Sequence, residues 1–194
     1  MATAGSSERQ QALWPAAAAS RAGSVWAVLD CARDPAVYGV LIESRLEFRS
    51  LYSGTVPRAL EMNAPQLVEL LPGHRLTERL LGAAWGQAWG IFLRIDDAAN
   101  LRHHLRKFLK VRDEQGRRLL FRYYDPRVLR SYLPTCTPEE LAQVFGPIHS
   151  FVMEDAEGAC IEFSRVAGVL RHRVLVPALA TTPPAPADTA SAAG

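Results

Sequence analysis

The chain has 194 residues, of which 48 % are hydrophobic, so it is long enough for one domain with its own core. Its 22 basic and 20 acidic side chains leave a net charge of +2, which does not require a nucleic acid or an anionic membrane as a partner. Three widely separated cysteines (Cys31, Cys136 and Cys160) give no sign of a disulfide framework and fit a reducing cytoplasm, and no apolar run approaches the roughly 20 residues that span a bilayer.

The two ends of the chain are predicted to be disordered tails. Residues 1–23 are rich in Ala, Ser and Gln without a clear period, and residues 176–194 are rich in Pro and Ala. Neither stretch can bury enough apolar area to offset the entropy of ordering it. Because no apolar segment follows a basic start, we expect no signal peptide. The folded domain is therefore expected to span residues 24–175, in a protein that stays in the cytoplasm.

Strands and helices alternate along the first half of this domain. Residues 25–29 form an apolar run typical of a buried strand, and Asp34 followed by Pro35 predicts a capped helix start. Further strands are expected at 48–52, at 58–61 before Pro65, and at 89–95, with a helix over residues 76–84.

The second half begins with an amphipathic helix, expected to open at residues 96–97 and to place Leu101, Leu105, Phe108 and Leu109 on one face. A hairpin is expected around residues 114–116 with a return strand at 119–124, then helices opening at Asp125-Pro126 and at Pro138, then strands at 150–153 and 160–163. This order predicts an α/β (or α+β) fold: a single mixed sheet flanked by helices and ending in a β-hairpin.

The charge is unevenly distributed along the chain. Residues 94–130 hold 11 Lys or Arg against 5 Asp or Glu. These basic residues form either the solvated faces of a helix and a hairpin or a docking surface for an acidic partner. A third possibility is a nucleic-acid-binding module that uses the basic 102–130 surface. In particular, residues 117–124 interleave arginines with aromatics, a pattern that can stack bases, although a half-buried strand with Arg at its rim explains it as well.

Motifs for enzymatic chemistry are scarce. Neither GxGxxG nor GxxxxGK[ST] occurs, so no glycine-rich phosphate loop is expected. His103 and His104 are adjacent and would point about 100° apart on a helix, so they cannot share a metal as an i, i+4 pair would. His104 lies near the apolar face, where a buried and hydrogen-bonded histidine is the simpler interpretation. We expect no cofactor and no metal.

Cys31 is the best candidate for a nucleophile, which leaves a thiol-dependent hydrolase as a further alternative. It lies close to Asp30 and Asp34. Neighbouring carboxylates raise a thiol pKa, which opposes formation of the reactive thiolate. A small buried residue at the end of a strand explains Cys31 equally well, and we expect no catalytic residues.

Several segments are more informative together than singly. The strand at 26–30 is followed by Tyr38, by Leu51-Tyr52 with Gly54, by APQLV at 64–68 and by WGIFL at 89–93. The segments LRHHLRKFL at 101–109 and FRYYDPRVL at 121–129 follow, and FGPI at 145–148 comes last. In this order and spacing, residues 25–155 resemble the type VI secretion adaptor or chaperone proteins (the Tap/TEC group), formerly catalogued as a domain of unknown function.

The resemblance implies a cytoplasmic, non-enzymatic protein. Members of that family bind an effector protein, and commonly the VgrG spike protein, so that the toxin is loaded before firing. No catalytic residues carry over from the family, and neither a nucleic acid nor a membrane is implied as a partner.

Asp125 and Pro126 are expected to form a strand-to-helix junction, with the aspartate as the cap. The flanking arginines could pair with Asp125 or with a carboxylate of the partner. Tyr and Arg are common at interface hot spots. The candidate partner-binding residues are Arg102, Arg106, Lys107, Lys110, Arg122, Tyr124 and Arg127.

Overall fold

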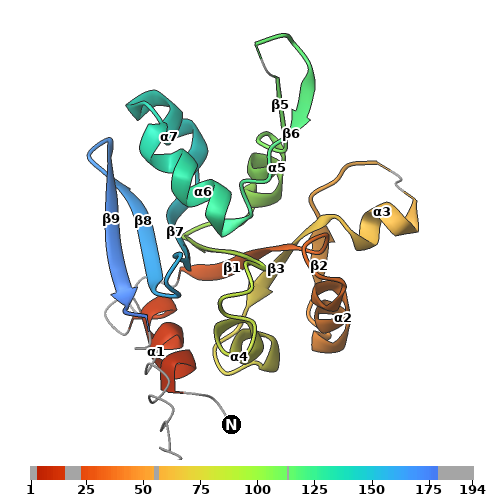
Figure 1. The fold of residues 1–194 in the computed structure, drawn as a ribbon, viewed down its shortest axis with the longest axis vertical. Helices are drawn as coiled ribbons and strands as arrows, with labels where there is room; N and C mark the ends of the chain where they lie inside the picture. Colours follow the sequence, from red (N-terminus) through yellow and green to blue (C-terminus); the bar gives the residue numbers. More distant parts are fainter. Residues whose placement is uncertain (1–3, 16–22, 55–56, 113, 179–194) are drawn as a thin grey trace, which may run out of the picture.

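The computed structural model describes residues 4–15, 23–54, 57–112 and 114–178. It contains one seven-stranded sheet with helices on both faces and a separate two-stranded hairpin that projects from the body (Figure 1). The strand order is β2-β3-β1-β4-β7-β8-β9. These strands are β1 (Ser24–Asp30), β2 (Phe48–Ser50), β3 (Pro65–Leu70), β4 (Gly90–Ile95), β7 (Ile148–Glu154), β8 (Cys160–Val166) and β9 (Val169–Val176), and the hairpin consists of β5 (Lys110–Arg112) and β6 (Arg118–Leu120).

The helices divide between the two faces of the sheet. One face carries α5 (Leu101–Arg106), α6 (Pro126–Tyr132), a short 3-10 turn at Leu133–Thr135, and α7 (Pro138–Phe145). The other carries α1 (Ala4–Leu13), α2 (Pro35–Ser44) and α4 (Arg75–Leu81). The short helix α3 (Arg58–Met62) lies beside β2 and buries none of its residues (Figure 1).

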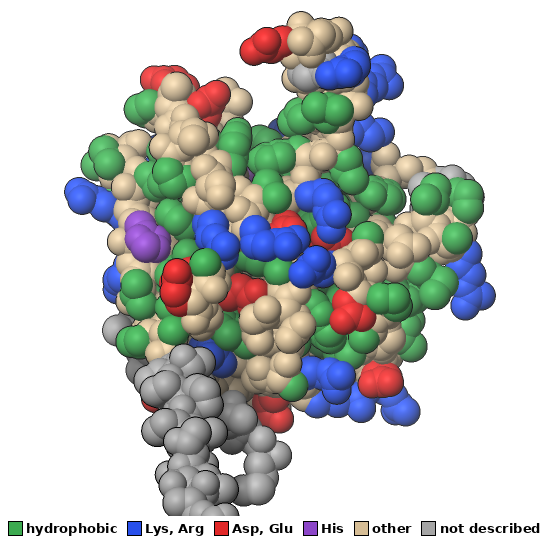
Figure 2. Space-filling view, in the orientation of Figure 1, with side chains coloured by type: hydrophobic (Ala, Val, Ile, Leu, Met, Phe, Trp, Pro, Cys, Tyr) green, Lys and Arg blue, Asp and Glu red, His purple; other side chains and the backbone are tan. Residues whose placement is uncertain are grey.

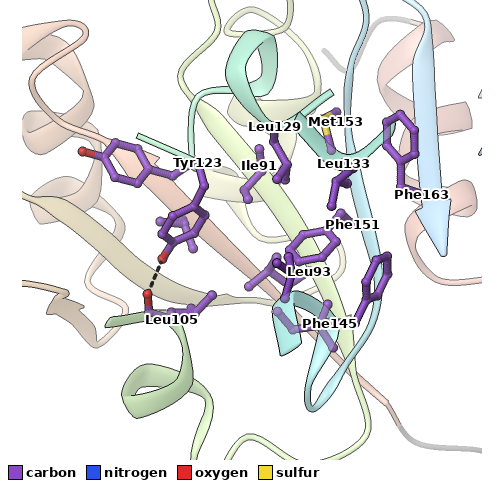
Figure 3. Packing of buried hydrophobic residues seen from close by; sticks show 14 of the residues in the cluster. Ile91, Leu93, Leu105, Tyr123, Leu129, Leu133, Phe145, Phe151, Met153 and Phe163 are labelled. Atoms are coloured by element: carbon purple, nitrogen blue, oxygen red, sulfur yellow. Dashed lines mark hydrogen bonds between the residues drawn. The ribbon is translucent and has the colours of Figure 1, made fainter. Parts of the chain in front are cut away.

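The central strand β1 explains why two cores form. It pairs with β3 along one edge and with β4 along the other. Helices cover both of its faces, and its sequence is accordingly almost uniformly apolar. Successive side chains alternate between faces. Val25, Ala27 and Leu29 pack with α1, α2 and α4, whereas Val28 packs with α5, α6 and α7. Figure 3 shows the second core, in which Phe145 and Phe151 pack edge to face.

The helix starts predicted at Pro35, Pro126 and Pro138 are confirmed. The Asp34 carboxylate accepts a hydrogen bond from the Ala36 N–H, with Pro35 in the first turn of α2. Asp125 caps α6 in the same way through the Arg127 N–H. Thr137 and Glu140 form a reciprocal capping box at α7. Each cap satisfies a helix N–H that has no partner within the helix.

The expected α/β or α+β class is confirmed, with two differences in the sheet. Every ladder is antiparallel, so the sheet does not mix directions. The domain ends in a three-stranded meander rather than a single hairpin, because residues 169–176 form an edge strand beside β8. The two Arg side chains and one His of this strand are exposed, which obscured its alternating pattern.

Two elements differ from the sequence-based expectation. Residues 58–61 lie in helix α3, and the strand starts at Pro65 instead. Proline is accepted at the first position of a strand because its missing N–H does not remove a ladder bond there. The amphipathic helix is also shorter than expected: α5 begins at Leu101, and the Asp97 side chain binds the Ala99 N–H in the loop before it.

The disordered tail expected over residues 1–23 is wrong for residues 4–13, which form α1. Leu13 is buried in the core between the sheet and helices α2 and α4. The Arg9 guanidinium donates to the Leu81 carbonyl at 2.7 Å. Arg9 also lies 4.6 Å above the Trp85 ring. These contacts come from a distant part of the chain, so composition alone could not reveal them. Residues 1–3 and 16–22, and residues 179–194 of the expected C-terminal tail, lie outside the described residues.

Among the helices in the described part of the chain, none combines the length and the apolar character that a membrane crossing requires.

Candidate docking surface

The seven candidate partner-binding residues do not form one continuous surface: some lie on or after α5, others lie near α6, and one is buried. Arg102 lies on α5 and donates to the carbonyl of Ser50 at 2.9 Å and to that of Tyr52 at 3.0 Å. It therefore fastens the segment after β2 to α5. Arg106 is half-exposed, and Lys107 and Lys110 are exposed at the base of the β5–β6 hairpin. These three basic side chains remain available to a partner.

Arg122 is held by Asp30, the last residue of β1. The two side chains form an ion pair, and Asp30 has no exposed surface. Asp30 also accepts a hydrogen bond from the Ala32 N–H. A buried carboxylate needs such partners to remain charged. Arg122 therefore neutralises a core charge and presents only part of its guanidinium to solvent.

Arg127 also pairs with a buried carboxylate, whereas Arg130 binds a backbone carbonyl. Arg127 forms a two-pronged contact with Asp125, with N–O distances of 2.9 and 2.6 Å. Arg130 donates to the Glu154 carbonyl at 3.3 Å. We call Arg122, Arg127 and Arg130 the arginine row. Basic side chains gather across the middle of the face in Figure 2, around α6 and the end of β1 in the view of Figure 1.

The carboxylates beneath the arginine row are buried. Burial pushes the pKa of Asp125 upward, but the hydrogen bonds from Arg127 outweigh burial, so the pKa lies below its usual value. For Glu154 burial dominates over the N–H donors of Gly86 and Ala88, and its pKa is raised. The row is therefore less positive than the local count of charges suggests, because part of it compensates acids in the core.

Tyr124 is not a surface residue. It is 2 % exposed and lies in the core between the sheet and helices α5, α6 and α7. The centroid of its ring is 5.6 Å from that of Tyr123. Burial also raises the pKa of its hydroxyl. The expectation that Tyr124 contacts a partner is wrong in this structure, because the β6 strand ends at Leu120 and the next residues turn inward.

A groove of about 390 Å³ lies on the α5 side of the sheet. Its apolar lining includes Trp26 of β1, Leu67 of β3 and Leu71 just after β3. Charged side chains also line it: Glu47, Arg49, Glu69 and Arg102. We call this the Trp26 groove.

The Trp26 groove follows from strand alternation and from the short length of α5. Trp26 stands opposite Glu69, and Leu67 opposite Arg49, so these side chains share one face of the sheet. Helix α5 starts only at Leu101 and spans six residues. The sheet next to its first turn is therefore left without a helix over it, and Ala98 and Ala99 border the opening.

This arrangement suits a short protein segment. An apolar floor with a few charged groups at its margin is the usual composition of a binding cleft. Trp and Arg are also the side chains that most often dominate interface energies. The groove offers both, with Trp26 on the floor and Arg49 and Arg102 at the margin.

Apart from Arg102, the groove residues were not among the candidates from the sequence. Had a strand been placed at 65–70, side-chain alternation would have put Leu67, Glu69 and Leu71 on one face. Placing a strand at 58–61 instead of 65–70 hid that pattern.

The features that suggested enzymatic chemistry are explained by packing. Burial, followed by the charge of Asp30, raises the pKa of the Cys31 thiol to about 12, and the side chain is buried. A thiol of this kind is protonated at neutral pH and out of reach of a substrate. His104 is buried and its Nε2 lies 2.9 Å from the Val144 carbonyl, which confirms it as a satisfied core histidine. In the described residues, no three His, Cys, Asp or Glu side chains come close enough to hold a metal ion.

The aromatic residues of the 117–124 segment also pack inward. Tyr123 is buried and donates to the Leu105 carbonyl at 3.0 Å (Figure 3). Phe121 is half-buried, with its ring 4.8 Å from that of Tyr132. The buried Tyr123 ring therefore has no free face of the kind that stacks nucleic-acid bases, and the Phe121 ring is partly covered.

The structure is an α+β domain with an open groove on one face of its sheet. Residues 25–143, more than half of the chain, match the family described as Domain of unknown function (DUF4123). The chain belongs to this family. No curated protein and no solved structure matched the chain.

Proposed function

We propose that this protein is a non-enzymatic adaptor that binds a type VI secretion effector in the cytoplasm and helps to load it onto the VgrG spike. Two lines of support meet here. The chain belongs to the DUF4123 family, and the sequence segments between residues 25 and 155 resemble those of type VI secretion adaptors. The surface has the composition of a protein-docking site.

The observation that carries the proposal is the Trp26 groove. Its floor is apolar and open, so an apolar side chain of the effector can be buried there. Arg49 and Arg102 at the margin favour an effector segment that also carries acidic residues. Lys107 and Lys110, farther along the same polypeptide segment, add positive charge for steering the encounter.

The test is a pull-down with the tagged protein as bait in lysate of cells that carry the secretion system, read by mass spectrometry. Leu71→Glu places a charge in the groove, at a side chain that is 46 % exposed. Leu60→Glu is the matched control, since Leu60 is 54 % exposed on α3 and does not line the groove. We expect the wild-type protein and Leu60→Glu to recover a large effector, with or without VgrG, and Leu71→Glu to lose the effector.

Two results would overturn the proposal. Equal recovery by all three proteins would remove the groove from the interface. Recovery of nucleic acid alone, or of a hydrolytic activity that Cys31→Ala abolishes, would replace the adaptor role with one of the alternatives.

A further inference from the structure

We infer that the outer edge of β9 is a second docking site, which accepts an extended, acidic segment of a partner protein as an additional strand of the sheet. This inference goes beyond the proposed function, which places one partner in the Trp26 groove.

Strand β9 is the last strand of the sheet and one of its two edges. It is eight residues long and pairs with β8 on its inner side, from Val166↔Val169 to Cys160↔Val176. Within the part of the chain that the structure describes, no strand pairs with its outer side (Figure 1). The opposite edge, β2, has only three residues. An edge strand of this length presents a row of backbone donors and acceptors on which another strand can form.

The turn before β9 determines which backbone groups face outward. Ala167 and Gly168 have φ values of 50° and 81°, as a two-residue type I′ hairpin turn requires. Val166 and Val169, which flank this turn, then exchange both of their hydrogen bonds. Because the pattern alternates along an antiparallel strand, the N–H groups that point away from β8 belong to Leu170, His172 and Val174.

The side chains of β9 specify the chemistry of the partner. The strand reads VLRHRVLV and contains no acidic residue. Val169 and Val174 are 55 % and 51 % exposed, and Arg171, His172 and Arg173 between them are exposed as well. Arg173 shares the buried carboxylate of Glu162 with Arg94, so a single acid serves two arginines. A segment in which β-branched residues alternate with Asp or Glu complements this edge in shape and charge.

The same charges argue against a second copy of this chain as the occupant. A two-fold antiparallel pairing of two β9 strands would bring the basic triplet 171–173 of one copy against that of the other. Like charges facing each other across a ladder are destabilising. Positive side chains on an edge strand are a common protection against self-association, and they leave acidic partners free to bind.

The β9 edge and the Trp26 groove lie toward opposite ends of the sheet. The groove is formed over β1 and β3, next to β2, whereas β9 ends the strand order on the other side. Strands β4, β7 and β8 separate them. A single domain could therefore hold two protein segments at once without overlap.

The experiment uses the full chain labelled with 15N and two blocked ten-residue peptides as probes. One peptide alternates Val with Glu, and the other alternates Val with Lys. We expect the Glu peptide to shift the amide resonances of β9 and to slow hydrogen exchange at Leu170, His172 and Val174 by about tenfold or more. The Trp26 indole resonance should not move. The Lys peptide should bind several-fold more weakly.

A charge-reversal variant tests whether the basic side chains of β9 determine which peptide binds. Arg171 is exposed on β9 and Arg75 lies at the start of α4, so Arg171→Glu and the control Arg75→Glu change the net charge of the protein equally. Arg171→Glu should reverse the preference in favour of the Lys peptide, and Arg75→Glu should leave it unchanged. Leu71→Glu should also leave peptide binding unchanged, which separates this site from the groove.

The inference is overturned if both peptides bind equally, if Arg171→Glu leaves the preference as it was, or if the shifts fall on groove residues. It is also overturned if the unliganded protein forms a dimer through β9. Sedimentation velocity would show this as a dimer that Arg171→Glu dissociates.

Discussion

At the residue scale, the buried charges depend on specific arginines. Asp30 lies at the end of a central strand with no exposed surface, and Arg122 is the charged group that compensates it. Replacing one partner of a buried pair costs about 3–5 kcal/mol, because the other charge is left alone in the core. The Arg122 side chain is 41 % exposed, so water can take over part of its role.

We therefore expect Arg122→Ala to lower the free energy of unfolding by about 2 kcal/mol. Arg49→Ala is the control, since Arg49 is largely exposed and lies 3.8 Å from an exposed Glu47, and it should change stability by less than about 0.5 kcal/mol. Urea denaturation at pH 7 measures both. Equal effects of the two substitutions would contradict the compensating role of Arg122.

His104 gives the fold a dependence on pH. Burial lowers its pKa, and the hydrogen bond to Val144, which raises the pKa, only partly offsets this. The folded state therefore favours the neutral ring. The ring also packs against Gly146, where φ is +46° and a Cβ would collide with the imidazole. The His104 ring is therefore closely packed in the folded state.

Because the folded-state pKa is depressed, the contribution of His104 to stability is complete above the unfolded value of about 6.5 and is lost as the pH falls through the folded value. We expect the stability advantage of the wild type over His104→Gln to shrink between pH 7.5 and pH 5.5 in urea denaturation. His103→Gln, at an exposed neighbour, should retain the pH dependence of the wild type. An advantage that stays constant over this range would contradict the assignment.

At the element scale, α1 extends the domain beyond the residues that match the family. Its sequence has no clear amphipathic period, and its docking depends on a few anchors, including Leu13, Arg9 and the ring of Trp85. Helices of this length have little stability in isolation. The packing against α4 and β9 therefore determines whether α1 forms.

Leu13→Ala should lower the free energy of unfolding by about 3 kcal/mol, the usual cost of a leucine-to-alanine cavity in a core. Gln11→Ala, at an exposed position on the same helix, should have almost no effect. Thermal or urea unfolding of the two variants measures the difference. If Leu13→Ala is as stable as the wild type, α1 is not docked in solution.

At the scale of the whole molecule, the sheet separates two surfaces of different chemistry. The Trp26 groove offers an apolar cleft with charged margins, and β9 offers a backbone edge with a positive centre. We expect Leu71→Glu and Arg171→Glu to remove different proteins from a pull-down, because mutations far apart act independently. Quantitative mass spectrometry of both variants and their combination checks this. Loss of the same protein from both single variants would mean that one partner spans the two surfaces.

Much of the architecture was predictable from local sequence. The apolar run of β1, the caps at Asp34 and Asp125 and the helix start at Pro138 depend on residues a few positions apart, and each is present as expected. The short segments that resembled a known family lie mostly within residues 25–143, which match the DUF4123 family. The alternation of strands and helices was enough to give the fold class.

The docking surface was less predictable. Arg102 and Arg106 were identified from the basic face of a helix, but Tyr124 belongs to the core, and Arg122 is committed to a carboxylate 92 positions away. Trp26, Arg49 and Leu71 come from three separate segments. Charge counting treats each basic residue as available, whereas the fold assigns several of them to buried acids.

By itself, the sequence determined the capped helix starts at Asp34 and Asp125, the buried strand at 25–29 and the class of fold, because these depend on capping, periodicity and local apolar content. Only the tertiary structure decided that α1 docks, that the sheet is left open beside α5, and which arginines remain available on the surface. These features depend on contacts between residues far apart in the chain, whose free energies appear only when the core closes and removes both partners from water.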